Sequence, residues 1–560
     1  MAGNKPSLSQ DPSPPCTALL SPIPNRSPIH GMQSHLRCLW WIWIVFALRV
    51  DAGSHRPPNF LFIVADDLGY GDLGAFGQKH IRTPHLDRLA SSGIRLTRLY
   101  SGNAVCAPSR CVLLTGRHPG HAVIRDNREV QPEGQIGLPG GLNTLPRILQ
   151  SRGYATGTFG KWGLGSPDSS GAPLQQGFDR FFGYNCQRQA HNHYPTHLWD
   201  DDRRLPLRNP TFSAYQQLPK TADPEDPASY RSYSGSDYAP DRIHEQALRF
   251  IRDHRHRPFF CFIPTTIPHL ALQVPDDSLQ EYAGAFPEKP YRGDQSYLPH
   301  RTPHAAYAAM ITRMDREIGR LIGLINELGL QQDTVVVFTS DNGPLWDRMG
   351  GTDTGFFNSA AGLRGRKGSL YEGGVRVPGI VSWPGHIQPA TESRRRIGFE
   401  DWLPTLLALA GGQDSIPKDL DGISFAPTLL GRRQAERRFL YREFPAYGGQ
   451  QAVWKGRWKA VRQNLISKDK PVTVRTELYD LERDPNETRD VASEHPKRVA
   501  SLERLLTQEH VPSTEFPFPV LDRLSTLDPQ LSTSPPLTAP SSSAPPHPPA
   551  RSGSLQTPDP

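Results

Sequence analysis

Two pairs of residues with oxygen-bearing side chains, far apart in this 560-residue sequence, are the first residues that could do chemistry. Asp66 and Asp67 adjoin in one short polar segment, and Asp341 and Asn342 adjoin in another. Adjacent carboxylates repel each other unless a cation or a proton lies between them. Oxygen ligands from Asp and Asn suit a hard cation, Ca²⁺ or Mg²⁺, and no His and Cys set of zinc spacing accompanies them. Because D-D-x-G and D-N-G are also common turn sequences, each pair alone could equally be a solvated turn.

A cysteine at the expected start of a helix is the third candidate. Cys106 opens the string CAPSRCVLLTGR, residues 106–117. Pro108 suits the first helical turn and Gly116 suits a helix C-cap. The free N–H groups and the dipole of such a helix favour an anion beside Cys106, and Arg110 lies one turn further along the same face. An ordinary reactive or buried thiol is the alternative for Cys106.

These candidates need elements that bring them together, and the sequence alternates buried strands with helices. Short apolar runs predict strands at 59–65, 153–159, 259–263 and 334–340. Helical spacing predicts helices at 83–92, 238–252 and 305–330. Continuous apolar strands that alternate with helices predict an α/β fold, with a mostly parallel central sheet sandwiched by helices.

Polar residues follow the C-terminal ends of these predicted strands. Asp66, Lys161, His269 and Asp341 each come shortly after one of the four. In open α/β sheets, ligands bind outside the carboxyl ends of the strands. The four segments together therefore predict one site at one edge of the sheet.

The chain is predicted to contain four segments. Residues 1–53 are an N-terminal extension and signal peptide, whose leader begins at Met32 and contains an apolar run (CLWWIWIVFAL) too short to span a bilayer. Residues 54–430 form the larger α/β domain, residues 431–510 a smaller α+β domain, and residues 511–560 a disordered tail rich in Pro, Ser and Thr. The leader predicts a secreted or periplasmic protein with no stable membrane span, and an uncleaved anchor is the alternative.

The charge balance disfavours one class of partner. The formal net charge is +7, and no run of Lys and Arg stands apart from an ordinary surface. This modest excess, together with an export signal, argues against nucleic acid as a partner. It fits an anionic small molecule or an anionic polysaccharide better.

The string that begins at Cys106 has the pattern C-x-P-S-R-x-x-L-L-T-G-R, which resembles the signature of the type I, formylglycine-dependent sulfatases. Other segments follow in that family's order, namely Asp66-Asp67, Gly160-Lys161-Trp162, Pro268-His269, Ser340-Asp341-Asn342-Gly343 and the Lys367 segment. The resemblance covers roughly residues 57–510. It looks closest to bacterial arylsulfatase A-like and N-acetylgalactosamine-6-sulfatase-like enzymes, and it implies an alkaline-phosphatase-like fold.

The resemblance also implies a modified nucleophile and a metal site. Cys106 would be converted to formylglycine (3-oxoalanine) by a formylglycine-generating enzyme or by an anaerobic sulfatase-maturating enzyme. In the family, the formylglycine oxygen and the residues that match Asp66, Asp67, Asp341 and Asn342 bind Ca²⁺. Mg²⁺ is the alternative ion.

The implied reaction is the hydrolysis of a sulfate monoester, on an aryl alcohol or a sulfated sugar, to the alcohol and inorganic sulfate. Arg110, Lys161 and Lys367 would neutralise the anionic substrate. His269 matches the family's histidine near the leaving-group oxygen and is a candidate general acid. A solvated surface lysine is the alternative for Lys367, and a core or capping histidine is the alternative for His269.

One position departs from the family pattern. Many members read G-K-W-H-L-G with a histidine beside the formylglycine, where this chain has Gly163. The segment QAHNHY offers a replacement imidazole, for which His191 is the first candidate and His193 the second. Both histidines could equally be loop residues or substrate contacts.

Two other functions stay open. The first is a formylglycine-dependent hydrolase of phosphodiesters or phosphonate esters. The second, from a different class, is a catalytically inactive protein that binds sulfated glycans, motivated by Gly163 and the basic balance. The expected pocket rim, about residues 185–235 and 270–305, carries no motif that identifies the alcohol half of the substrate.

Overall fold

A computed structural model describes residues 56–467 and 471–527. The predicted N-terminal extension and signal peptide lie outside these residues, as does the predicted tail beyond residue 527. Within the described ranges, no helix has the length and apolar character needed to cross a membrane.

A ten-stranded sheet forms the centre of the fold. Its five middle strands, β9-β1-β8-β4-β5, are mutually parallel. Antiparallel pairs extend the sheet on both sides, and a parallel pair of β2 with β12 ends it on one side. The strands in spatial order are β12 (Thr391–Ser393), β2 (Ile94–Leu96), β11 (Gly379–Ser382), β9 (Thr334–Ser340), β1 (Asn59–Ala65), β8 (Phe259–Pro264), β4 (Ala155–Lys161), β5 (Arg180–Tyr184), β6 (His197–Asp200) and β7 (Arg203–Pro206). The mostly parallel sheet expected from the sequence is therefore confirmed.

Strand β1 shows why the apolar runs are continuous. Its side chains alternate between two hydrophobic cores, with Leu61 and Ile63 in one and Phe60 and Phe62 in the other. All of them are fully buried. A strand covered on both faces has no solvent side, and its sequence therefore lacks the polar alternation of a half-exposed strand.

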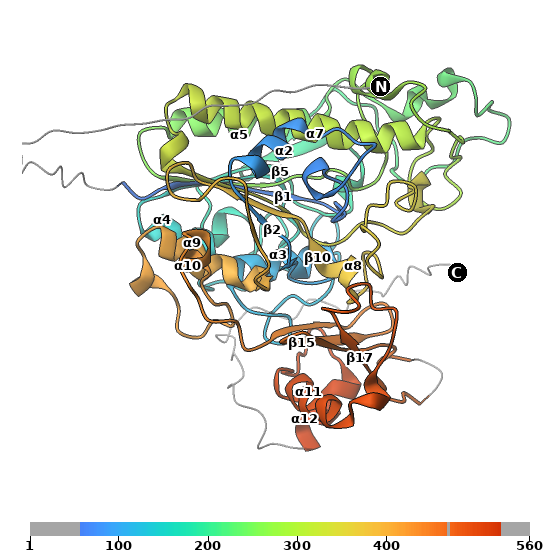
Figure 1. The fold of residues 1–560 in the computed structure, drawn as a ribbon. Coiled ribbons are helices and arrows are strands. Elements are labelled where there is room, and N and C mark those ends of the chain that lie inside the picture. The colour runs from blue at the N-terminus through green and yellow to red at the C-terminus, as the bar shows by residue number, and fades with distance from the viewer. Residues whose placement is uncertain (1–55, 468–470, 528–560) are drawn as a thin grey trace, which may run out of the picture. The chain divides into compact units, whose positions relative to one another are not determined.

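Helices cover both faces of the sheet, as Figure 1 shows. The first core is packed by α2 (Pro84–Ser91), α5 (Ala239–Asp253) and α7 (Pro303–Glu327). The second is packed by α3 (Cys106–Thr115), α4 (Leu145–Ser151), α9 (Trp402–Leu409) and α10 (Ala426–Leu429). Two one-turn helices complete this part, α6 (Asp276–Leu279) and α8 (Glu372–Val375), with a small sheet of β10 (Arg376–Val377), β3 (Leu99–Tyr100) and β13 (Ile397–Gly398).

The C-terminal part is a separate, smaller antiparallel sheet, as expected. Its strands are β14 (Leu440–Phe444), β15 (Gln450–Lys455), β16 (Trp458–Arg462) and β17 (Thr476–Asp480), followed by α11 (Pro496–Gln508). The disordered tail predicted from residue 511 is wrong at its start, because α12 spans Pro519–Leu527. The cause is local packing: Phe518 and Leu521 are buried against Leu465, which composition alone does not reveal.

A buried ion pair joins the small sheet to the larger part. The Arg442 guanidinium, on β14, lies 2.9 Å and 3.2 Å from the two carboxylate oxygens of Glu400. Its Nε donates to the Ser101 carbonyl at 2.8 Å. Arg442 is 0% exposed and Glu400 1%, so neither charge has water as a substitute partner. Removing Arg442 would leave the buried Glu400 charge with only the longer contact to Arg437, at 3.4 Å.

We expect Arg442→Met to lower the free energy of unfolding by about 3–5 kcal/mol, the cost typical of breaking a buried pair. Arg394 is the matched control, because its pair with Glu392 lies on the surface, with an 82% exposed arginine. Arg394→Met should cost less than about 1 kcal/mol. Urea denaturation of both variants measures the difference, and equal losses would contradict a structural role for the buried pair.

Candidate functional site

The two acidic pairs meet because their strands are neighbours. β1 and β9 run parallel, and the last residue of one is paired with the last residue of the other. Asp66 and Asp67 therefore leave the sheet beside Asp341 and Asn342. Asn342 is hydrogen-bonded to Asp67, although 275 positions separate the two residues in the sequence. The prediction that these four residues share one sheet edge holds for their positions in the fold.

Hydrogen bonds shape the two turns into one pocket. The Asp67 backbone N–H donates to Asp341 Oδ1 at 3.2 Å, and the Leu68 N–H donates to Ser340 Oγ at 3.0 Å. Asn342 Nδ2 donates to Asp67 Oδ1 at 2.7 Å. Asp67 has a φ of 65°, in the left-handed region that few non-glycine residues adopt. Such strain persists only where the surroundings enforce it, and it is common at functional sites.

Cys106 is the first residue of α3, as expected from the sequence, and its side chain is only 1% exposed. Its Sγ lies 3.4 Å from Asp66 Oδ1 and 3.6 Å from Lys161 Nζ. Burial raises the pKa of the Cys106 thiol to about 12, although Lys161 and Lys367 oppose the shift. The unmodified thiol is therefore a poor nucleophile at neutral pH.

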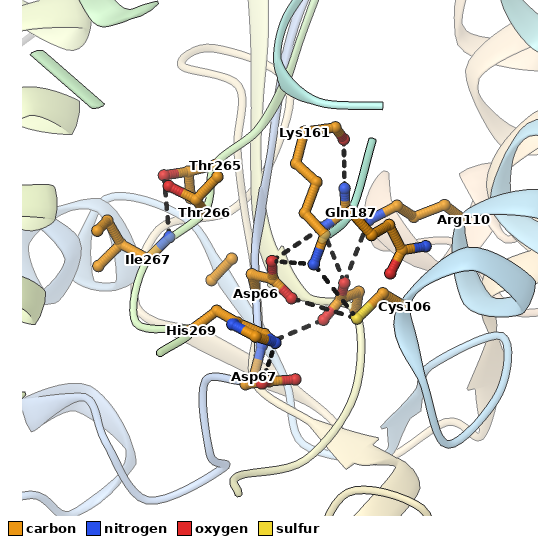
Figure 2. Close-up of polar contacts among 12 residues, drawn as sticks. Asp66, Asp67, Cys106, Arg110, Lys161, Gln187, Thr265, Thr266, Ile267 and His269 are labelled. Carbon is orange, nitrogen blue, oxygen red and sulfur yellow. Dashed lines mark hydrogen bonds and ion pairs between the residues drawn. The ribbon is translucent and has the colours of Figure 1, made fainter. Parts of the chain in front are cut away.

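Three cations face the carboxylates, each from a different segment. Lys161, the last residue of β4, donates from Nζ to Asp66 Oδ2 at 2.7 Å, and both side chains are 0% exposed. Arg110 donates from Nε and a terminal nitrogen to Asp341 Oδ2, at 3.2 Å and 2.9 Å, and also to the Lys161 carbonyl. Figure 2 shows Lys161, Arg110 and Cys106 converging on Asp66.

The third cation, Lys367, comes from the loop between β9 and β10. Its Nζ lies 2.9 Å from Asp67, and its side chain is 12% exposed, so it reaches the site from the open side. Its backbone N–H donates to the Pro344 carbonyl at 2.8 Å. The flanking Gly365 and Gly368 both have positive φ, which the sharp loop requires. The structure thus places Lys367 in the site rather than on the open surface.

The carboxylates differ in their electrostatic surroundings. Burial alone would raise the pKa of Asp66, but Lys161, His269 and Arg110 hold it well below its ordinary value. Burial raises the pKa of Asp341 to about 7, with Asp66 adding to the shift and Arg110 opposing it. Burial also raises the pKa of Asp67 against the field of Lys367. The protein charges alone therefore do not fully stabilise three ionised carboxylates in this space.

The donor set fits a hard divalent cation. Asp66, Asp67 and Cys106 offer ligand atoms that lie within 4.8 Å of one another. Asn342 Oδ1 is buried, and within the described ranges it has no hydrogen-bond partner. A buried oxygen without a donor usually has an unseen partner such as an ion or a water. Carboxylate and amide oxygens around one point are the ligands of Ca²⁺ or Mg²⁺.

Three predicted histidines occupy different positions. His269 lies 3.4 Å from Asp67 Oδ2 through Nε2, and its Nδ1 donates to the Leu270 carbonyl at 2.7 Å. His191 stacks flat on His269, with ring centroids 4.5 Å apart. His193 is fully buried and bonds the His269 carbonyl at 3.1 Å, which makes it a support for the loop after β8. His269 is thus the histidine whose free nitrogen faces the acidic pocket.

The space beside Gly163 is filled by a residue that sequence reasoning missed. A Cβ at Gly163 would approach within 2.8 Å of the Gln187 side chain. Gln187 Nε2 also lies 3.4 Å from Asn127 Oδ1, which accepts a hydrogen bond from the Ala107 N–H at 3.0 Å. The side-chain amide of Gln187 therefore lies beside Gly163, where we expected the imidazole of His191. His191 stacks on His269 instead. No signal in the sequence marks Gln187, because only the fold brings it to position 163.

Comparison with known proteins agrees with this geometry. The "Sulfatase" family model matches residues 58–412, and the model for the C-terminal region of N-sulphoglucosamine sulphohydrolase matches residues 366–511. Arylsulfatase A of Bos taurus is 33% identical over 507 residues, covering 84% of this chain and 92% of its own. N-acetylgalactosamine-6-sulfatase of Homo sapiens is 30% identical over 436 residues, covering 74% and 75%. A solved structure concerned with glycosaminoglycan metabolism in Bacteroides thetaiotaomicron has a TM-score of 0.62 and 26% identity, covering 80% and 98%.

If the acidic pocket holds a cation, Ca²⁺ should raise the melting temperature of metal-free protein. A ligand that binds only the folded state adds about 2.7 kcal/mol at 100 times its Kd, so the shift should amount to several degrees. Asn342→Leu removes the unpartnered Oδ1 and should lose most of the shift. Asp202→Asn, at a 76% exposed carboxylate, should keep it. An undiminished shift in Asn342→Leu would place the bound cation elsewhere.

Proposed function

Because this chain belongs to the sulfatase family, we propose that it cleaves sulfate monoesters with Cys106, converted to formylglycine, as the nucleophile. It is a sulfuric ester hydrolase, and members of its family generally use formylglycine and a divalent metal. The observation that carries the proposal is the convergence of Arg110, Lys161 and Lys367 on the three buried carboxylates. One of these carboxylates, Asp66, contacts Cys106 at the start of α3.

The thiol itself is unsuited to this chemistry. Cys106 is buried, and its raised pKa keeps it protonated. Oxidation of its side-chain carbon to an aldehyde, with loss of the sulfur, gives a group that adds water to form a geminal diol. One hydroxyl attacks sulfur and displaces the alcohol, and the other loses its proton and expels sulfate, which restores the aldehyde. The Sγ atom stands in for one of these oxygens.

Charge explains why an anionic ester would bind here. The three carboxylates of the site are balanced by Arg110, Lys161 and Lys367. A bound divalent cation would supply a net positive charge and polarise an oxygen of the ester, and Asp66, Asp67, Asp341 and Asn342 would hold it. Lysine and arginine groups fixed before the reaction stabilise the charge that develops on the sulfuryl oxygens.

His269 is the proposed acid for the departing alcohol. Because Nδ1 is committed to the Leu270 carbonyl, Nε2 is the ring nitrogen that faces the site. A proton carried there can pass to the ester oxygen as its bond to sulfur breaks. The flat stack of His191 fixes the plane of the ring, which gives His191 a positioning role.

The route to an active enzyme requires a second protein. Formylglycine forms by modification of Cys106, so a formylglycine-generating or anaerobic maturating enzyme is the expected partner. Export follows from the leader read in the sequence, and we propose a secreted or periplasmic location. Ca²⁺ is the proposed ion, because the sequence resembles that of calcium-dependent members.

The alternative functions have less support. An inactive glycan-binding protein would not need every charged group of the reaction. All six are present and form ion pairs with one another, namely Asp66, Asp67, Asp341, Arg110, Lys161 and Lys367. A phosphonate or phosphodiester hydrolase on this fold would require the same charges, and the sulfatase relatives do not favour it. Assay of aryl sulfates against phosphodiesters on one preparation distinguishes these functions.

Mature protein from a competent host should lack the Cys106 thiol. Mass spectrometry of the peptide that contains Cys106 should show a loss of about 18 Da, the difference between a CH₂SH and a CHO group. Cys111, five residues away, is the internal control and should stay a thiol. Fully active protein that keeps the Cys106 thiol would refute the formylglycine mechanism.

His269→Ala should harm the enzyme most where the leaving group is poor. General acid catalysis contributes ~10²–10⁴-fold, so kcat/KM should fall by about that factor on a sugar sulfate, whose hydroxyl needs a proton. On nitrophenyl sulfate, whose anion is stable, the fall should be much smaller. His386→Ala, at an exposed histidine, is the control and should leave the ratio of the two substrates unchanged. Equal losses on both substrates would remove His269 from the acid role.

A further inference from the structure

A cavity of about 540 Å³ lies in the part of the fold next to β5 and β6. Three segments form its wall, residues 129–133, 186–197 and 211–215. None of the side chains in the charge network of the site lines it. Most of this wall falls in the rim region where the sequence carried no motif, and a cavity of this size is in the range of small-molecule sites.

Each wall segment is linked to the site through one intervening residue. The first begins two residues after Asn127, which bonds the Ala107 N–H beside Cys106. The second contains His191, stacked on His269. The third ends at Tyr215, whose hydroxyl is hydrogen-bonded to His191 Nδ1. Through Tyr215 and His191 the cavity is connected to the His269 side of the site, where the proposed mechanism places the departing alcohol.

We propose that this cavity is a subsite for an uncharged sugar unit joined to the sulfated one, so that the substrate is a glycan of at least two units. The inference rests on the proposed function. It assigns the alcohol half of the substrate by the chemistry of the cavity wall.

The polar groups of the wall are paired in a way that suits hydroxyl groups. Glu133 accepts from Trp199 Nε1 at 2.7 Å, from Arg204 at 2.8 Å and from His197 at 3.1 Å. These bonds fix the carboxylate, whose remaining lone pairs can accept from sugar hydroxyls. The carboxylates of Glu129 and Glu133 are already neutralised by arginines. The wall therefore binds most favourably a neutral ligand that is rich in hydrogen-bond donors and acceptors.

Tyr215 adds an aromatic surface to the cavity wall. Tyr215 is 40% exposed, which is unusual for a large apolar side chain. Arg188 holds its guanidinium 5.6 Å from the Tyr215 ring centroid and pairs with Glu129 at 3.2 Å. An exposed ring beside fixed polar groups matches a pyranose, which has an apolar C–H face and a hydroxyl edge. A small aryl sulfate would leave these groups unused.

The same charges disfavour an acidic neighbour. Glu129 and Glu133 both line the cavity, and the cations near them, Arg188 and Arg204, are already paired with them. A uronic acid or a second sulfate in the cavity would approach these two carboxylates, and both arginines beside them are already paired. Like charges in a partly buried space repel strongly. The cavity should therefore bind an uncharged sugar unit in preference to an acidic one.

The test compares three forms of one ester on the mature enzyme. The probes are a 6-O-sulfated N-acetylhexosamine alone, the same unit linked to galactose, and the same unit linked to glucuronic acid. The kcat/KM for the galactose-linked probe should be at least about ten times that for the single sugar, because the added contacts should strengthen binding by about tenfold. The glucuronic acid probe should gain nothing. Similar values for all three, or turnover of aryl sulfate alone, overturn the subsite.

Variants separate the cavity from general damage. Tyr215→Ala should abolish most of the preference for the galactose-linked probe, and Tyr215→Phe, which keeps the ring, should retain it. Arg188→Gln should reduce the preference, while Arg394→Gln, at an exposed and paired arginine just after β12, should not. A wild-type enzyme that cleaves no sulfate ester at all would instead refute the proposed function, so the two failures are distinguishable.

Discussion

Three buried carboxylates at one edge of the sheet set the conditions that the rest of the site must meet. Asp66, Asp67 and Asp341 are at most 1% exposed, and an uncompensated buried charge costs several kcal/mol. The fold responds with three cations from three separate segments, each within 3 Å of a carboxylate oxygen. The raised pKa values of Asp67 and Asp341 show that this compensation is incomplete. A divalent cation, which sulfatases generally use, would complete it, and the proposed metal site would then share its charges with the proposed binding site for an anionic ester.

The smaller sheet contributes to this site indirectly. Gln450, on β15, donates from Nε2 to the Gly368 carbonyl at 2.6 Å, and its Oε1 accepts from the Leu370 N–H at 2.9 Å. These bonds fix the loop that carries Lys367. The buried pair of Arg442 and Glu400 holds the sheet in place. The C-terminal part therefore helps to position one of the three cations.

The reacting groups were predictable where a short string of residues carries the chemistry. Cys106 and Arg110 lie on one helix turn, so their relation is local and the sequence specifies it. Lys161 and His269 were predictable in kind, because each follows a buried strand of a parallel sheet. Gln187 was not predictable, because it reaches Gly163 only after β4 and β5 pair. The helix α12 was missed for the same reason, since its burial depends on Leu465.

By itself, the sequence determined the α/β class, the helix that begins at Cys106 and the identity of the charged groups. Apolar periodicity and local turn chemistry act over a few residues, and they can be read directly from the order of side chains. Only the tertiary structure decided which groups meet: the order of strands brings Asp66 to Asp341, and three segments on both sides of β5 in the chain line the cavity beside Tyr215. These contacts join residues far apart in the chain, and their energies depend on burial and distance, which are properties of the folded molecule.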